Sequence, residues 1–156
     1  QIFHKSSINK IIRDSLILVQ TNGLTSRVDF NIHLDDRVPD IDVDASGLKQ
    51  VFLNLLINAV QAIKARGEIT ISTVQSAIDK IEIKIEDNGV GMNDDIKKKI
   101  FMPFFTTKPL GTGLGLSIVQ RIINEHGGHI VIESCMNYGT KVIITLPMIR
   151  NNHDEL

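Results

Sequence analysis

The chain has 156 residues, which fits one domain of ordinary size and argues against two. Its 17 basic and 18 acidic residues give a net charge of -1, which gives no support to a nucleic-acid-binding surface, because such surfaces carry a basic excess. One cysteine excludes an internal disulfide and a cysteine-based zinc cluster, and the lack of a long apolar run or signal-peptide core predicts a soluble chain that does not contact the membrane.

Two helices and two strands are predicted in the first part of the chain. Helices are identified by apolar residues spaced three and four apart, and strands by apolar residues that alternate with polar ones. In chain order they are an amphipathic helix over 7–21, a half-buried strand over 28–34, a short strand over 39–43 and a second helix, capped by Asp44 or Ser46, that runs to about Ala65. Apolar residues surround most of this second helix, so we expect it to be buried.

The remaining elements are strands and two further helices. In order they are strands 69–73 and 81–85, a polar helix 94–100, a helix 114–126 ended by two glycines, and strands 129–133 and 141–146. We expect the first two of these strands to pair. Helices and antiparallel-looking strand pairs in this order predict an α+β fold of two layers, in which one mixed, mostly antiparallel sheet carries helices on one face.

Two amides, Asn54 and Asn58, lie four residues apart on the second helix and share one face, with Gln61 one turn further. A buried carboxamide without a partner costs about 1–3 kcal/mol, so this row needs either protein partners or a ligand. An amide oxygen is a hard, neutral ligand that suits Mg²⁺. The helix alone leaves two interpretations open: a magnesium-binding face, or amides that satisfy neighbouring backbone in the core.

The next motif, Asp87-Asn88-Gly89-Val90-Gly91, directly follows a predicted strand. An Asp at a strand end can accept a hydrogen bond from an exocyclic amine, and a site built to pair one donor rejects analogues that lack it. The glycines would let the backbone approach a flat ring closely. The alternative is an ordinary turn with Asx hydrogen bonds.

Two further motifs lie between residues 101 and 116. Stretch 101–108 has three Phe residues within five positions. This pattern predicts either a mobile lid or a loop whose Phe side chains fill the core. Lys108, at the end of the stretch, could reach a terminal phosphate as a point charge. Gly111-Thr112-Gly113-Leu114-Gly115-Leu116 opens a helix, where free amides and the helix dipole form an anion site. Its spacing matches neither the dinucleotide-binding nor the Walker A pattern, and a flexible connector is the alternative.

In this order, the four motifs resemble the N, G1, F and G2 boxes of the ATP-binding catalytic domain of sensor histidine kinases, over about Val28 to Leu146. Residues 104–116 look especially like the nitrogen-sensing branch of that family. The wider superfamily includes DNA gyrase, a heat-shock chaperone and mismatch-repair ATPases. The resemblance implies that the chain binds Mg-ATP under a mobile lid and transfers the γ-phosphoryl group to a histidine on a dimerisation domain, from which a response regulator takes it.

The resemblance also implies a role for each site residue. Asn58 would hold Mg²⁺, and Asp87 would accept from the adenine amino group, with Gly89 and Gly91 nearby and Thr140 supporting that contact through water. The lid would contribute cofactor contacts from Thr107, Lys108, Gly111, Thr112, Gly113, Leu114, Gly115 and Leu116.

Catalytic roles are implied for Asn54 and Lys108. Asn54 stands where ATP-hydrolysing members of the superfamily carry a Glu that activates water, and an amide cannot take that proton, so hydrolysis should be slow. One position departs from the family: Gln61 stands where many relatives carry Lys or Arg, and Lys64 or Lys108 is the candidate replacement for that phosphate contact.

The acceptor histidine is expected outside this chain, because His4 lacks the acidic neighbour and nearby Pro of such sites. We expect residues 1–6 to be the end of a dimerisation hairpin or a linker, 7–150 the catalytic domain and 151–156 a tail. Because the chain starts in mid-pattern without Met, we expect it to be a piece of a longer protein. The resemblance implies that the intact kinase is a homodimer, with or without a membrane anchor, and that its catalytic domain lies in the cytoplasm. The piece itself is expected to be a monomer with little autophosphorylation alone. The alternatives are an anti-sigma-factor serine kinase and a non-catalytic nucleotide-binding regulator.

Overall fold

Five strands of the chain form one sheet in the order β2-β4-β5-β7-β6. They are β2 (Val28–Leu34), β4 (Gly67–Ala77), β5 (Lys80–Asp87), β6 (His129–Cys135) and β7 (Gly139–Pro147) in the computed structural model, which describes residues 1–21, 23, 25–107, 113 and 115–149. β2 pairs with β4 in parallel, and the other neighbouring strands are antiparallel. The predicted mixed, mostly antiparallel sheet is confirmed.

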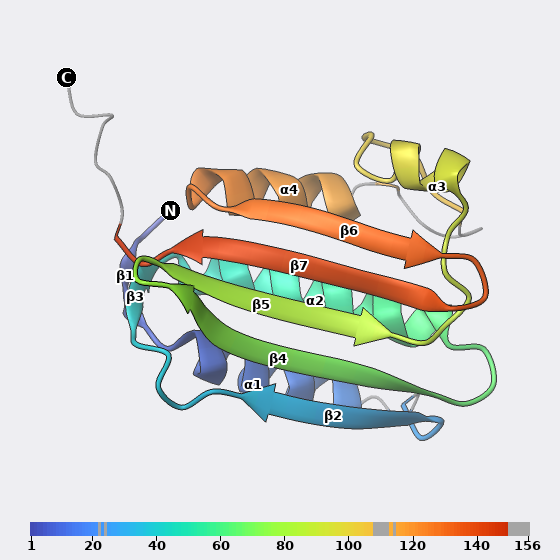
Figure 1. Ribbon diagram of the computed structural model, residues 1–156, viewed down its shortest axis with the longest axis horizontal. Helices are drawn as coiled ribbons and strands as arrows, with labels where there is room; N and C mark the ends of the chain where they lie inside the picture. The colour runs from blue at the N-terminus through green and yellow to red at the C-terminus, as the bar shows by residue number, and fades with distance from the viewer. Residues whose placement is uncertain (22, 24, 108–112, 114, 150–156) are drawn as a thin grey trace.

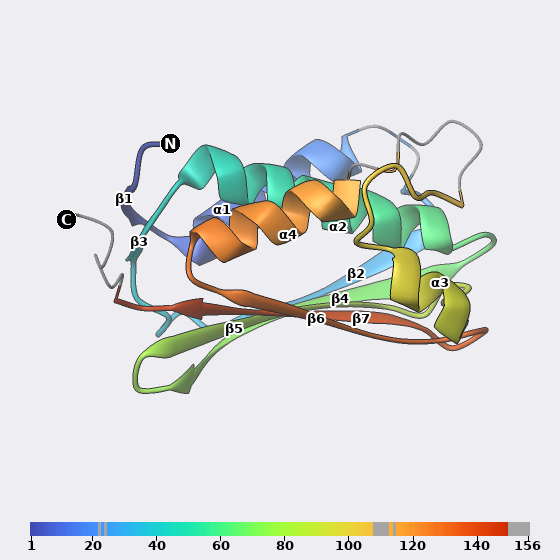
Figure 2. The ribbon, with the colours of Figure 1, turned by 90° about the horizontal axis from the view of Figure 1, so that it is seen from above.

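Three helices cover one face of this sheet, as Figure 2 shows from above. They are α1 (Ile8–Gln20), α2 (Ala45–Ala62) and α4 (Gly115–Glu125). The core between the two layers is aliphatic, and alternate residues of β5 (Ile81, Ile83 and Ile85) point into it with at most 3% of their surface exposed. The two-layer α+β prediction is therefore confirmed. None of the helices in the described part of the chain is long and apolar enough to cross a membrane.

Side-chain caps fix where the helices begin. Ser7, Asp44 and Asn93 cap α1, α2 and the short helix α3 (Asp94–Lys99), and each accepts a hydrogen bond from the amide three residues on, at 3.2, 3.1 and 2.8 Å. Such a cap satisfies one of the unpaired N–H groups at the start of a helix and contributes about 1 kcal/mol. Of the two caps predicted for α2, the structure selects Asp44.

Helix α2 ends earlier than predicted, at Ala62 instead of about Ala65. Its C-cap, Ile63, is extended and buries its side chain in the core. The Arg27 guanidinium, just before β2, donates to the carbonyl oxygens of Ile63 at 2.9 Å and Val60 at 3.0 Å. This contact joins residues far apart in the chain and brings side-chain donors to the last carbonyls of the helix, where intrahelical donors run out, and local propensity gives no sign of it.

The prediction that α2 is buried is wrong for one side of the helix. Ile57 is 42% exposed and Gln61 is exposed, while Asn54 and Asn58 are half-buried. α1 and α4 flank α2, and the sheet lies against another side of it (Figure 2). The predicted row of amides therefore lies along a partly open side of the helix and not inside the core.

A second, two-stranded sheet joins the start of the chain to the segment just before α2. Strand β1 (His4–Ser6) pairs antiparallel with β3 (Ile41–Val43), and the Phe3 ring packs on that of His126 with 4.9 Å between centroids. The short strand expected near 39–43 is confirmed, and β1 was not predicted. Residues 4–6 are extended in the structure.

The register of the central sheet separates its two ends. Lys80 pairs with Pro147 at one end of the β5–β7 ladder, and Asp87 pairs with Thr140 at the other. The N-terminus, β1 and the end of β7 lie at the first end, on the left of Figure 1. Helix α3 and the β6–β7 hairpin lie at the second end, so the residues after β5 are gathered there.

Candidate functional site

The turn that follows β5, over Asn88–Gly91, is fixed from two sides. The Val90 N–H donates to the Ala62 carbonyl at the end of α2, at 3.0 Å, and the Val90 carbonyl accepts from the Asn137 N–H in the β6–β7 hairpin, at 2.7 Å. Both contacts use backbone atoms, so they constrain the path of the turn directly. The turn is thus a rigid bridge between α2 and the hairpin.

The glycines of this turn are required by close contacts within the protein. A Cβ on Gly89 would lie 2.5 Å from the Ala62 carbonyl oxygen, and one on Gly91, whose φ is +66°, would lie 2.0 Å from the carbonyl oxygen of Cys135. Both distances are shorter than any real Cβ contact. Packing against the chain's own backbone explains why these positions are glycine, and the predicted approach to a flat ring remains an expectation.

Asp87 ends β5 as a buried acid, with 8% of its surface exposed. Its Oδ1 accepts from the Gly89 N–H at 2.9 Å, which is the Asx hydrogen bond of the alternative interpretation, and the Thr140 backbone also donates to the carboxylate. Burial raises the pKa of the Asp87 carboxyl above its usual value, backbone hydrogen bonds from Gly89 and Thr140 offset part of that rise, and nearby Glu86 adds to it. An ionised carboxylate has about four acceptor positions, so this acid can also accept from a ligand.

The amide row of α2 connects this turn to the start of α4. Asn54 Nδ2 donates to the carbonyl oxygen of Gly115 at 3.5 Å, a long hydrogen bond. Asn58 is one helical turn before Ala62, the residue that contacts the turn after Asp87. Three of the predicted motifs therefore meet along one half-exposed side of α2.

The described residues contain no group of three or more His, Cys, Asp or Glu side chains that could hold a metal ion. A divalent cation at this site would therefore need amide oxygen, phosphate and water as ligands, which is a donor set that Mg²⁺ accepts. Asn58 lies on the half-exposed side of α2 and supplies such an oxygen. The residues present thus fit the predicted ion.

A row of polar side chains crosses three strands beside the turn. Asp87 pairs with Thr140, and Thr140 pairs with Ser134, so the three residues lie on one face of the sheet. The Thr140 and Ser134 hydroxyl oxygens are 2.8 Å apart. The sequence did not single out Ser134, because one Ser in a strand forms no pattern.

The described part of the 101–116 region brings its two motifs together. The Phe104 N–H donates to the Gly113 carbonyl at 3.0 Å, and both residues have positive φ. Phe104 is 76% exposed, so it does not fill the core, while Phe101 and Phe105 are half-buried. Thr107 is exposed, and Leu116 is half-buried against the core.

Half of the predicted lid contacts fall on residues that the structure does not describe. Lys108, Gly111, Thr112 and Leu114 lie outside the described residues. Gly115 begins α4, close to Asn54, and a Cβ there would have no neighbour within 4 Å.

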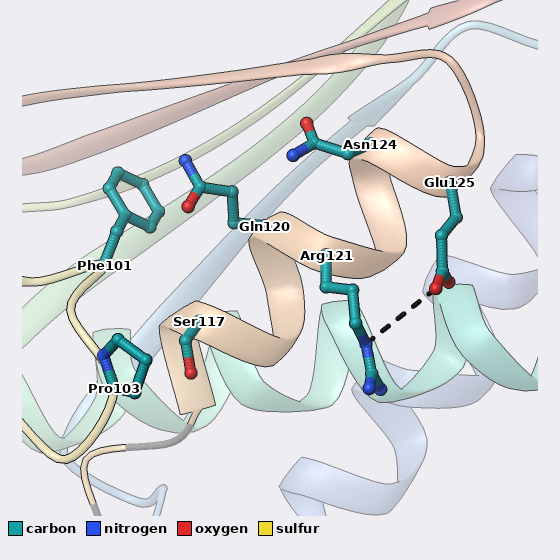
Figure 3. Close-up of a pocket in the computed structure, with 7 residues that line it drawn as sticks. All are labelled: Phe101, Pro103, Ser117, Gln120, Arg121, Asn124 and Glu125. Carbon is teal, nitrogen blue, oxygen red and sulfur yellow. Dashed lines mark ion pairs between the residues drawn. The ribbon is translucent and has the colours of Figure 1, made fainter.

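Two hollows lie on the surface of the described residues, one on α4 and one at the turn after β5. The larger hollow, of about 570 Å³, lies along α4. Figure 3 shows the residues that line it: Phe101, Pro103, Ser117, Gln120, Arg121, Asn124 and Glu125. A smaller hollow of about 220 Å³ is lined by residues of the α2 end, the turn after β5 and the hairpin: Ala62, Ile63, Lys64, Arg66, Asn88, Gly89, Val90 and Asn137. Only Gly89 belongs to the predicted site residues, and Lys64 to the candidate phosphate contacts.

Comparisons with known proteins identify the family of this chain. Residues 43–150 match the family described as Histidine kinase-, DNA gyrase B-, and HSP90-like ATPase. The sequence is 51% identical over 142 residues to the signal transduction histidine-protein kinase AtoS of Escherichia coli (strain K12), covering 91% of this chain and 23% of that protein. The chain spans about a fifth to a third of the length of the curated relatives it matches.

Solved structures of similar proteins give the same fold. A nucleotide-free catalytic domain of histidine kinase ThkA superposes with a TM-score of 0.83 and 35% identity, covering 95% of this chain and 99% of that one. Histidine kinase ThkA in complex with the response regulator protein TrrA gives a TM-score of 0.79 and 31% identity, covering 94% of this chain and 42% of that one.

Proposed function

Since the chain belongs to the histidine kinase-, DNA gyrase B- and HSP90-like ATPase family and is an ATP-binding catalytic domain of the sensor histidine kinase type, we propose that it transfers the γ-phosphoryl group of Mg-ATP to a histidine on a dimerisation domain. The observation that carries this proposal is the buried, doubly hydrogen-bonded Asp87 beside the half-exposed amide row of α2.

Asp87 recognises the base. The backbone N–H groups of Gly89 and Thr140 hold its carboxylate in place, and burial removes competing water. An exocyclic amine that donates to this carboxylate forms a charge-assisted hydrogen bond, whereas a carbonyl at the same position meets a second acceptor. The preference for adenine over a base with a carbonyl at that position follows.

Asn58 would hold Mg²⁺ through its amide oxygen, and the ion, when bound, would neutralise charge on the phosphates. Asn58 itself is neutral, so it does not repel the phosphates as a carboxylate would. The remaining predicted contacts bind the phosphates of ATP. They are Thr107, Lys108, Gly111, Thr112, Gly113, Leu114, Gly115 and Leu116.

Asn54 does not promote hydrolysis of the γ-phosphoryl group. A carboxamide cannot take a proton from water, so this position does not activate a water molecule. In the transfer, the bond between the γ-phosphorus and the bridging oxygen breaks while a bond to an imidazole nitrogen forms, and positioning with charge neutralisation is the main requirement. Slow hydrolysis leaves the phosphoryl group available for the histidine.

The acceptor histidine belongs to another segment of the intact protein. We assign residues 7–150 to the catalytic domain, 151–156 to a tail and 1–6 to the connection with the dimerisation hairpin. The extended conformation of His4–Ser6 favours a linker over the end of a helical hairpin. The complex of ThkA with a response regulator supports an Asp-containing receiver domain as the next acceptor.

Transfer between separate molecules tests this function. The chain is mixed with γ-labelled ATP, Mg²⁺ and a separately made dimerisation hairpin, and labelled phosphate on the hairpin is measured after acid and after alkali treatment. We expect acid-labile, alkali-stable label on the hairpin and none on a hairpin whose histidine is replaced by Gln. ATP binding without such label would refute the histidine kinase proposal, and acid-stable label would point to the serine kinase alternative.

A further inference from the structure

The side-chain hydroxyl of Ser134 makes hydrogen bonds to three different residues. Its Oγ accepts from the Met92 N–H at 2.8 Å, lies 3.1 Å from the Gly139 carbonyl oxygen, and lies 2.8 Å from the Thr140 hydroxyl oxygen. The hydroxyl thus joins the residue after the glycine turn to the start of β7. Thr140 is in turn the cross-strand neighbour of Asp87.

The protons of this cluster can be counted. A hydroxyl has one proton and two lone pairs. The Met92 N–H uses one lone pair of Ser134, and the Gly139 carbonyl can only accept, so the Ser134 proton goes to Gly139. The remaining short contact then requires the Thr140 hydroxyl to donate to the second lone pair of Ser134. All three hydrogen bonds are satisfied by this one arrangement.

We propose that Ser134 is a positioning residue for base discrimination, because it takes the Thr140 proton and leaves the Thr140 oxygen as an acceptor beside Asp87. Opposite residues on neighbouring strands lie about 5 Å apart, so one small ligand group can reach both Asp87 and Thr140. Thr140 is half-buried and remains accessible. This inference rests on the proposed nucleotide-binding function.

The chemistry of the ligand edge follows from two neighbouring acceptors. An exocyclic amine carries two N–H groups and can serve both, directly or through a water molecule. A carbonyl at the same position faces two acceptors and is rejected. Loss of Ser134 would free the Thr140 proton, and the hydroxyl could then turn and donate to such a carbonyl, so discrimination would weaken.

The test compares ATP with inosine triphosphate, in which a carbonyl replaces the amine. Dissociation constants of both are measured by calorimetry for the 156-residue chain, Ser134→Ala, Thr140→Val and the double variant. Ser72→Ala, on the opposite face of the sheet, is the matched control, and thermal melting confirms that every variant is folded. Ser134→Thr keeps the hydroxyl and should restore wild-type discrimination.

We expect Ser134→Ala to lower the ratio of the inosine triphosphate to the ATP dissociation constant by about fivefold, the factor that corresponds to one neutral hydrogen bond. In the Thr140→Val background the same change should leave that ratio unaltered, since no proton is left to redirect. Equal weakening of both nucleotides by Ser134→Ala, or the same fivefold effect in the Thr140→Val background, would mean that Ser134 only supports the turn, and would overturn the inference. If the unaltered chain binds ATP without preferring it over inosine triphosphate, the base-recognition proposal fails as well.

Discussion

Replacing Asp87 by Asn changes one atom of the base-recognition site and keeps its shape. In the wild-type chain the carboxylate accepts from the backbone N–H groups of Gly89 and Thr140 and still has room for a ligand donor. An Asn side chain has a single acceptor atom, and its NH₂ group must face one of these three donors. The variant therefore cannot satisfy both backbone N–H groups and an adenine amine together.

The expected loss of affinity follows from the charge on Asp87. A hydrogen bond to a charged group contributes about 1.5–3 kcal/mol, so its loss should raise the dissociation constant for ATP by roughly 10- to 150-fold. Without nucleotide the same change should not destabilise the fold. Burial raises the pKa of Asp87, so the folded state disfavours its charged form, and a neutral Asn relieves that cost.

The pH dependence has opposite signs for folding and for binding. Because the folded pKa of Asp87 is raised, its contribution to stability is present below its unfolded value, which is about 3.8, and is lost as the pH rises through the folded pKa. Lowering the pH from neutral towards 3.8 thus favours the ligand-free fold through this group. ATP affinity should fall over the same window, because a protonated carboxyl donates where an acceptor is needed.

Calorimetric titration with Mg-ATP and thermal melting of the ligand-free protein measure the two effects. Asp29→Asn, which makes the same chemical change at an exposed position of β2, is the control for net charge. We expect Asp29→Asn to bind as the wild type does and Asp87→Asn to melt no lower than the wild type while losing affinity. If Asp87→Asn binds ATP within threefold of the wild type, the assignment of the adenine contact is wrong.

Four further substitutions test the rest of the site. Asn58→Ala should remove the Mg²⁺-dependent part of ATP affinity, so that titrations with Mg²⁺ and with a chelator agree; a Mg²⁺ dependence equal to that of the wild type would refute the metal assignment. Gly91→Ala should lower the free energy of unfolding by more than about 2 kcal/mol in denaturant titrations, because the φ of Gly91 is positive and an added Cβ would meet the Cys135 carbonyl. Gly115→Ala, where an added Cβ has room, should leave the free energy of unfolding unchanged or raise it by up to about 1 kcal/mol. Similar values for the two variants would contradict the packing described for the turn. Asn54→Glu should raise steady-state ATP hydrolysis, measured as released phosphate, and no increase would argue against the role given to this amide.

Helix α2 illustrates how far the sequence predicts the fold. Its type and its start follow from local spacing and from Asp44, and the other helices and the strands of the central sheet were predicted on the same basis. The open side that carries Asn54 and Asn58 was not predicted, because hydrophobicity around a helix does not tell which neighbours cover it. Where α2 ends depends on Arg27, a residue distant in the chain, and such contacts leave no local pattern.

The sequence predicted those residues of the candidate site whose type and spacing indicate a chemical role. Asp87 and the amides of α2 stand at recognisable intervals, and the structure brings their motifs together. Ser134 escaped notice because its importance comes from strand register, which pairs it with Thr140. Strand β1 was not predicted for a related reason: its three residues show no alternating hydrophobicity and form a strand only by pairing with β3.

The polarity of the central sheet has a practical consequence for tethering the protein. Along β5, the residue that pairs with Pro147 and the residue that pairs with Thr140 are separated by roughly 24 Å, at 3.4 Å per residue over the strand. The first residues of the chain lie at the Pro147 end (Figure 1). A sensor surface, bead or fluorescent fusion attached through the first residues would therefore leave Asp87 directed towards the solution, and nucleotide association could be recorded without the support blocking entry.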